Sequence, residues 1–123
     1  TAAFIQYTHA RIKSLMRKAE ENGIVLEAAT EASLLGDSEK ALLKSLYAYP
    51  QVVEAAGEGY SPALIANYMF DLAKDFNSFY QASPIFKEDN AALRALRLRI
   101  SQMVAMVLKR GMALLGIDVP EKM

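Results

Sequence analysis

The chain has 123 residues, of which 53% are hydrophobic and 23% charged, and its 14 basic and 14 acidic side chains leave no net charge. This length and apolar content predict a single domain with its own core and exclude a disordered chain. Because cysteine is absent, the sequence excludes a disulfide scaffold, and no apolar run approaches the roughly 20 residues that span a bilayer. We therefore expect a cytoplasmic protein with no membrane association. Since helical sequence begins at Thr1 without a starting Met, we expect a part of a longer polypeptide.

Apolar residues recur with helical spacing, which predicts an all-α bundle of about four to five helices. In chain order, the predicted helices cover residues 2–22, 37–49, 51–56, 63–81 and 90–115, and the main predicted loops cover 24–36 and 82–89. Gly23 and Gly116 suit the C-terminal ends of the first and last helices. Ser61 followed by Pro62 suits the start of a helix.

The apolar positions of the three longest predicted helices define the expected core. They are Ile5, Ile12, Met16 and Ala19, then Ile65, Met69, Leu72, Phe76 and Phe79, then Leu93, Leu96, Ile100, Met103, Val107 and Leu114. Each set lies on one face of its helix at 100° per residue. Met106 and Met112 are also expected to fill the core rather than to bind a ligand.

The charges are unevenly distributed although they cancel overall. Residues 1–19 carry four basic and no acidic side chains, residues 20–59 carry eight acidic and two basic ones, and residues 85–110 are again basic. If the two basic segments pack side by side, a neutral protein presents a local positive surface to a polyanion. Mild charge runs like these are common on the solvated faces of helical proteins, so charge alone does not establish such a surface.

No combination of residues predicts catalysis. The single histidine, His9, has no motif around it, and we expect it to serve packing or hydrogen bonding. Gly57 and Gly59 lack the third glycine and the preceding strand of a dinucleotide-binding loop, so they indicate a turn. We therefore predict no catalytic residues, no metal ligands and no cofactor in this domain.

The first predicted helix has an aromatic and basic face about a quarter turn from its apolar stripe. This face comprises Phe4, Tyr7, Arg11 and Lys18, whereas Gln6, Lys13 and Arg17 are expected to point to solvent. An aromatic ring can stack on an unstacked base while a cation pairs with the neighbouring phosphate, so the face suits single-stranded nucleic acid. Alternatively, Phe4 and Tyr7 pack under a neighbouring helix, and spacing alone does not decide.

Four separated blocks of sequence resemble one known family. They read QYTHARI (6–12), IANYMFDLAK (65–74) followed by residues 76–80, VLKRGM (107–112) followed by 114–117, and VPEKM (119–123). In this order they resemble the C-terminal anticodon-binding domain of arginyl-tRNA synthetases, an all-α domain of class I synthetases named for an Asp-Ala-Leu-Arg signature. The nearest string here is Arg94-Ala95-Leu96-Arg97, which departs from the signature at its first position.

The resemblance implies which residues approach RNA. The base-contacting aromatic residues of the family fall on Phe4 and Tyr7, and Arg11 follows one turn later, where it is placed to meet phosphate. The loop before the last helix and the terminal methionine approach the anticodon in this family. With Lys18 from the basic face, the predicted RNA-binding residues are Phe4, Tyr7, Arg11, Lys18, Tyr80, Ile85, Phe86, Lys87 and Met123.

The resemblance also implies a function for residues 1–123 as a whole. We expect an anticodon-binding domain that docks the anticodon loop of an arginine tRNA, as a C-terminal fragment of a longer, monomeric synthetase. The parent would attach arginine to the tRNA with ATP and magnesium in a catalytic domain absent from this sequence. The residues alone also permit a different class, a helical protein-interaction module with an exposed aromatic and basic face.

Overall fold

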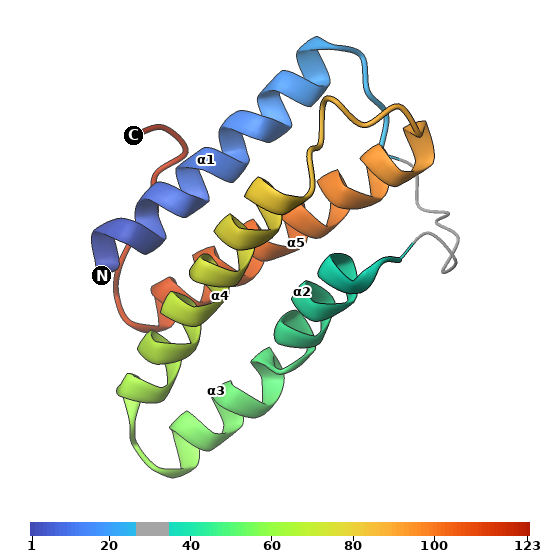
Figure 1. Cartoon of the computed structure of the whole chain (residues 1–123). Helices are drawn as coiled ribbons and strands as arrows, with labels where there is room; N and C mark the ends of the chain where they lie inside the picture. Colours follow the sequence, from blue (N-terminus) through green and yellow to red (C-terminus); the bar gives the residue numbers. More distant parts are fainter. Residues whose placement is uncertain (27–34) are drawn as a thin grey trace.

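The computed structural model describes residues 1–26 and 35–123, and these residues form five helices. The helices are α1 (Ala2–Glu21), α2 (Asp37–Tyr47), α3 (Tyr49–Glu58), α4 (Pro62–Ala82) and α5 (Ala91–Leu114). Helices α4 and α5 form the centre, with α1 on one side and α2 and α3 on the other (Figure 1). The predicted all-α bundle is confirmed, while most of the loop predicted over 24–36 lies outside the described residues. None of the described helices combines the length and apolar character needed to cross a bilayer.

The break between α2 and α3 differs from the prediction. Pro50 lies in the first turn of α3, where its missing N–H costs nothing, so α2 ends at Tyr47 and α3 starts earlier than expected. Helix α3 also runs further, because Gly57 is still helical and the predicted glycine turn begins only at Gly59. The two long helices α4 and α5 match their predicted spans to within one residue.

The core contains most of the predicted inward residues, and the exceptions share one face of α5. Phe76, Met69, Leu72 and Ile12 are fully buried. The prediction of a core position is wrong for Met103, Met106 and Leu114, which are 39%, 49% and 58% exposed. These three positions lie within about 80° of one another around α5 at 100° per residue, so the exposed apolar side chains share one side of this helix.

Helices α1 and α5 end in the same backbone conformation. Gly23 and Gly116 have φ angles of 69° and 74°, a left-handed conformation that glycine adopts without strain. In each case the following amide reaches back to close the helix: Ile24 N–H donates to the Ala19 carbonyl and Ile117 N–H to the Met112 carbonyl, both at 2.9 Å. The turn at Gly116 sends residues 117–123 back along α1, so both termini lie on the same side of the bundle (Figure 1).

Candidate nucleic-acid interface

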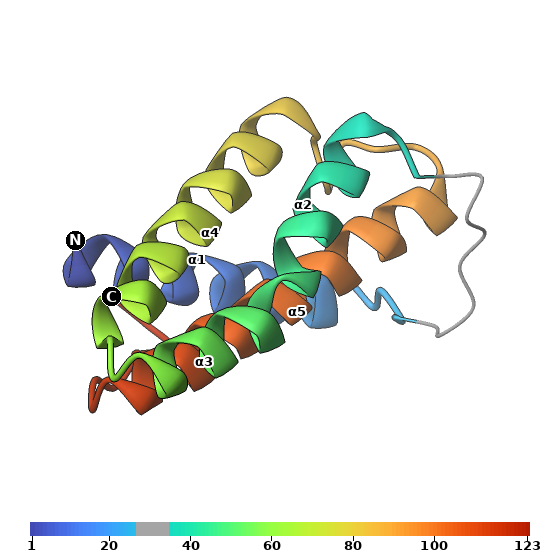
Figure 2. The same ribbon diagram turned by 90° about the horizontal axis from the view of Figure 1, so that it is seen from below.

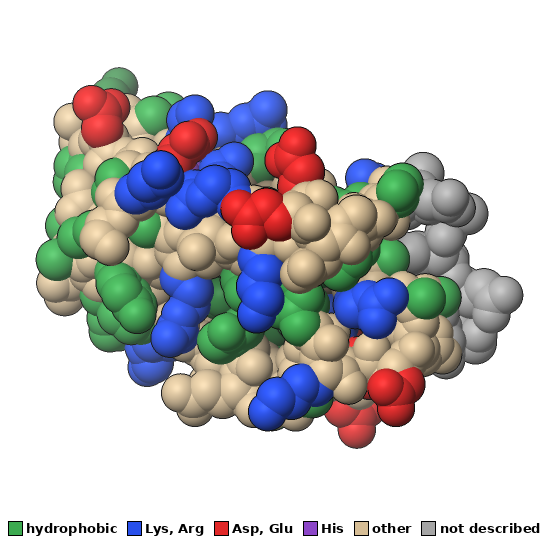
Figure 3. All heavy atoms as spheres, turned by 90° about the horizontal axis from the view of Figure 1, so that it is seen from above, with side chains coloured by type: hydrophobic (Ala, Val, Ile, Leu, Met, Phe, Trp, Pro, Cys, Tyr) green, Lys and Arg blue, Asp and Glu red, His purple; other side chains and the backbone are tan. Residues whose placement is uncertain are grey.

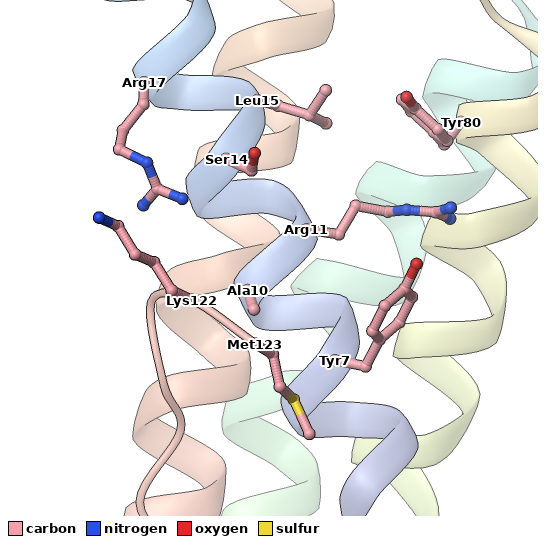
Figure 4. Close-up of a pocket in the computed structure, with 9 residues that line it drawn as sticks. All are labelled: Tyr7, Ala10, Arg11, Ser14, Leu15, Arg17, Tyr80, Lys122 and Met123. Carbon is pink, nitrogen blue, oxygen red and sulfur yellow. The ribbon is translucent and has the colours of Figure 1, made fainter.

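Tyr7, Arg11 and Tyr80 form a stack that joins α1 to α4 (Figure 4). The guanidinium carbon of Arg11 lies 5.4 Å from the centre of the Tyr7 ring and 4.8 Å from that of Tyr80. Tyr80 is itself stacked on the buried Phe76 ring, at 6.1 Å between centroids and 18° between planes. Two aromatic faces therefore hold one permanent cation between them, and cation–π attraction favours this arrangement. Two residues of α1 and one residue of α4 thus form a single surface.

A hydrogen-bond chain from α4 fixes the direction of Arg11. The Nη1 atom of Arg11 donates to Asn77 Oδ1 at 2.6 Å. The amide group of Asn77 is oriented in turn, because its Nδ2 atom donates to Thr8 Oγ1 at 3.0 Å and to the Ala73 carbonyl at 2.8 Å. With both amide hydrogens committed, Asn77 can offer Arg11 only its oxygen. The guanidinium is thereby preorganised, and it carries further N–H donors beyond the one that bonds Asn77.

A pocket of about 470 Å³ opens beside this stack. Tyr7 and Arg11 line it from α1, Tyr80 lines it from α4, and Lys122 and Met123 line it from the C-terminal tail (Figure 4). Tyr7 is 48% exposed and Met123 71% exposed, so both remain accessible from solvent. Arg17 adds a further cation to the lining. Two aromatic rings, a thioether and three cations thus line one hollow.

A second cation–aromatic pair lies further along α1. The Nζ atom of Lys18 sits 4.5 Å from the centre of the Phe86 ring, which comes from the loop between α4 and α5. Phe86 is half-buried and Lys87 beside it is exposed. The structure therefore places the loop residues next to the same helix that carries Tyr7 and Arg11.

A buried ion pair anchors this loop. Arg97 of α5 donates to Glu39 Oε1 at 2.9 Å and to Glu88 Oε1 at 3.2 Å, and it also reaches the Pro84 carbonyl at 2.6 Å. Burial alone would raise the pKa of Glu39, but hydrogen bonds from Arg97, its own backbone and Ser38 outweigh burial and lower it. Ser38 also bonds Ser83, so the start of α2 lies against the loop (Figure 2).

Two predicted contact residues have different surroundings. Ile85 is only 3% exposed and packs in the hydrophobic core, so its side chain cannot reach RNA and is not proposed as a contact. Phe4 is half-buried, with its ring centre 5.7 Å from that of Phe70, and it does not line the pocket. Of the two interpretations of Phe4, the structure therefore favours packing against a neighbouring helix.

The tail beyond Gly116 lies against α1 and changes the expected role of two polar residues. Gln6 and Arg17 were expected to point to solvent, yet both donate hydrogen bonds to carbonyl groups of the tail. His9 is 1% exposed and bonds the tail as well, in agreement with the expected packing and hydrogen-bonding role. Burial lowers the pKa of His9 and so favours the neutral ring.

The electrostatic character of the surface is mixed rather than uniformly basic. Figure 3 shows Lys and Arg side chains spread across one face, among apolar side chains and acidic ones. Within residues 1–26 and 35–123, no three His, Asp or Glu side chains come together as a metal site requires. The arrangement can stack a planar group and neutralise an anion beside it.

The chain as a whole matches a known family of domains. The model of the DALR anticodon binding domain matches residues 5–123, nearly the whole chain. The chain belongs to this family. The arginine that ends the family's signature string, Arg97, is the one that anchors the loop, so here it serves the fold.

Relatives of this DALR domain are much longer than the chain. It is 47% identical over 124 residues to the arginine–tRNA ligase of Porphyromonas gingivalis and 46% identical to that of Bacteroides thetaiotaomicron, covering all of this chain but 21% of each relative. The Thermus thermophilus arginyl-tRNA synthetase structure superposes with a TM-score of 0.87 at 34% identity, over 98% of this chain and 21% of that one. The chain thus spans about a fifth of the proteins it resembles.

Sequence reasoning missed three residues of this DALR domain that lie at the site. Arg17 and Lys122 line the pocket, and Asn77 holds Arg11. The helical position of Arg17 predicted only exposure to solvent. Its contact with the returning tail depends on tertiary structure, which helical spacing does not reveal. Lys122 stands within the VPEKM block, next to the predicted Met123, so that block contained the available signal.

Proposed function

We propose that this domain binds the anticodon loop of an arginine tRNA. The observation that carries the proposal is the Tyr7–Arg11–Tyr80 stack beside a pocket of about 470 Å³, on a domain whose family is defined by anticodon binding. An unstacked base meets the half-exposed Tyr7 ring, where stacking contributes about 1–3 kcal/mol. A base in such a pocket leaves its phosphate near cations, which favours single-stranded RNA over a neutral ligand.

The cations proposed to contact phosphates lie at two places, around the pocket and toward the loop between α4 and α5. Arg11 carries further N–H donors beyond the one that bonds Asn77, and Arg17 and Lys122 lie on the other side of the pocket (Figure 4). Lys18, Phe86 and Lys87 extend the surface toward the α4–α5 loop. Met123 offers an apolar edge to a base within the pocket. In this proposal Tyr7 and Met123 contact bases, and the cations contact phosphates.

The reaction itself belongs to another part of the parent protein. We infer that residues 1–123 are the C-terminal domain of a cytoplasmic, monomeric synthetase, since the ligases that the chain resembles are about five times longer. Among the described residues no group of three His, Asp or Glu side chains could hold a metal ion, and we assign the binding of ATP and magnesium to the parent protein. That chemistry, and the attachment of arginine, lie in a catalytic domain outside this chain, and docking of the anticodon loop positions the tRNA for it.

The test is an NMR titration of the 123-residue domain with an anticodon stem-loop of an arginine tRNA. The matched control is the same stem-loop with its central anticodon base changed. We expect shifts at Tyr7, Tyr80, the 83–90 loop and Met123 that are larger for the cognate stem-loop. Affinity should fall with added salt through counterion release.

The contrary result is equally clear. If neither stem-loop shifts these signals at low salt and high concentration, the domain does not bind RNA on its own surface, and the proposal fails. A partner protein that binds the same face without salt dependence would instead support an interaction module. The family match does not favour that second candidate.

A further inference from the structure

The C-terminal tail is held on α1 by three side chains that all bind its main chain. Gln6 Nε2 donates to the Asp118 carbonyl at 2.9 Å, His9 Nδ1 lies 2.7 Å from the Pro120 carbonyl, and Arg17 Nη1 donates to the Glu121 carbonyl at 3.2 Å. The donors advance along α1 as the acceptors advance along the tail. Because every acceptor is a backbone oxygen, these bonds fix the path of the tail independently of its side chains.

His9 holds the central position among these three. It is buried, whereas Gln6 and Arg17 lie at the partly exposed edges. A carbonyl can only accept, so Nδ1 carries the hydrogen, and Nε2 has no hydrogen-bond partner in the described part of the chain. Because the His9 ring is buried, breaking this bond leaves its N–H without a partner inside the protein, whereas water can replace the two exposed bonds at the edges.

The position of the tail decides whether the pocket is complete. Lys122 and Met123 follow directly after the last anchored carbonyl, that of Glu121, and they form one wall of the pocket beside Tyr7 and Arg11 (Figure 4). A shift of the tail by one residue would exchange which side chains face the hollow. The anchoring residues therefore control a binding surface that they do not line, Arg17 excepted.

We propose that His9, assisted by Gln6 and Arg17, is a positioning residue that sets the register of the C-terminal tail and so places Lys122 and Met123 at the RNA-binding pocket. The part concerning RNA rests on the proposed function, and the part concerning the tail does not. His9 acts through the tail and does not touch the RNA.

The first test measures the tail without RNA, using a matched pair of variants. In His9→Asn the amide Nδ2 takes a place near that of the imidazole Nδ1 and keeps the donor, whereas His9→Gln moves the amide further out. We expect the methyl signal of Met123 to become mobile in His9→Gln and to stay ordered in His9→Asn. Gln6→Ala, at the edge of the contact, should loosen the tail partially without threatening the core.

A tail that stays equally ordered in His9→Gln and in Gln6→Ala would overturn the positioning role. If His9→Gln does not fold, the Gln6→Ala and Arg17→Ala variants decide the same question. Both replace partly exposed side chains and leave the core intact. Digestion by carboxypeptidase gives an independent readout, because a released tail is cut faster than a docked one.

The second test couples the anchor to RNA by a double-mutant cycle. In the intact chain, His9→Gln should weaken binding of the anticodon stem-loop about tenfold. After deletion of residues 122–123, the same substitution should have little further effect, because the side chains it positions are gone. An equal loss in both backgrounds would assign His9 to the general stability of the fold and overturn the proposal. If the unmodified domain binds no RNA at all, the proposed function fails while the measurement of the tail still stands.

Discussion

The cation–aromatic face of α1 has two ends that are built differently. At the pocket end, Arg11 lies between two tyrosines and is fixed by Asn77, whose own amide is held by two further acceptors. At the loop end, Lys18 rests on the single ring of Phe86. The first arrangement is rigid because packing and hydrogen bonds determine each group. The second joins a long flexible side chain to a loop.

The difference suggests a division of work between the two ends. A preorganised site loses little entropy on binding, so contacts made there discriminate between bases most effectively. A flexible lysine pairs with a phosphate of any nucleotide and adds affinity without reading the sequence. We therefore expect base specificity from the pocket end and general affinity from the loop end.

Replacing Arg97 with alanine should cause the largest change, a loss in the free energy of unfolding that originates at the loop end. The substitution leaves the Glu39 carboxylate, whose side chain is 3% exposed, without its cation. Removing one partner of a buried ion pair costs about 3–5 kcal/mol, and urea denaturation should show a loss of that size in the free energy of unfolding. Arg99→Ala, an exposed position on the same helix, should change it by less than about 0.5 kcal/mol.

NMR spectra of Arg97→Ala would also show whether the two ends are independent. The signals of Phe86 and Lys18 should move, because the loop loses its anchor at Pro84 and Glu88. Those of Tyr7 and Tyr80 should stay in place. Equal movement at Tyr80 would mean that the two ends form one unit.

The Tyr7→Ala substitution should have the next largest effect, at the pocket end. Loss of a stacking surface should weaken binding of the cognate stem-loop by about 1–3 kcal/mol in an isothermal titration. The stability of the fold should change little, because Tyr7 is 48% exposed. Tyr47→Ala, a 71% exposed tyrosine on α2, is the matched control and should bind normally. A collapse of the melting temperature in Tyr7→Ala would make this ring a core residue instead.

Salt dependence separates Arg11 from Lys18. Either alanine variant should reduce the slope of log affinity against log salt by about 0.7, the value for one phosphate contact to a single strand. Only Arg11→Ala should also reduce the preference for the cognate central base, because it disturbs the Tyr7–Tyr80 stack. An unchanged slope would remove the substituted residue from the phosphate contacts.

Features set by a single helix could be predicted from the sequence. The spacing of Tyr7, Arg11 and Lys18 at 100° per residue was enough to place them on one face of α1, and the structure has them there. Gly23 and Gly116 marked the helix ends because the left-handed turn strongly favours glycine. The resemblance added Tyr80, and the structure places it against Arg11.

Features that depend on two elements meeting could not be predicted in this way. Nothing local distinguishes Ile85, which enters the core, from Phe86, which remains half exposed beside Lys18. Gln6 and Arg17 have the helical positions of solvated residues, and only the return of the tail gives them partners. The exposed Met103 and Met106 show the converse, since an apolar residue needs a neighbouring element to become buried.

The smallest expected effect concerns pH and the tail at the pocket end. Burial lowers the pKa of His9 from 6.5, and the charges of Lys13 and Lys109 add to this, while the bond to Pro120 and the charge of Glu121 oppose it. Near pH 6.5 the unfolded chain therefore binds a proton more readily than the folded chain does. The free energy of unfolding should fall as the pH drops below that value. Glu39, whose pKa is lowered from 4.5, loses its contribution only in more acidic solution.

Between pH 7.5 and pH 5.5, then, His9 dominates the change in stability. The melting temperature of the unmodified domain should fall over this interval. In His9→Asn, which keeps a donor but cannot titrate, this fall should disappear. A melting temperature that falls equally in the two proteins would assign the pH dependence to other groups. A rise toward pH 5.5 would contradict the burial of a neutral imidazole beneath the tail.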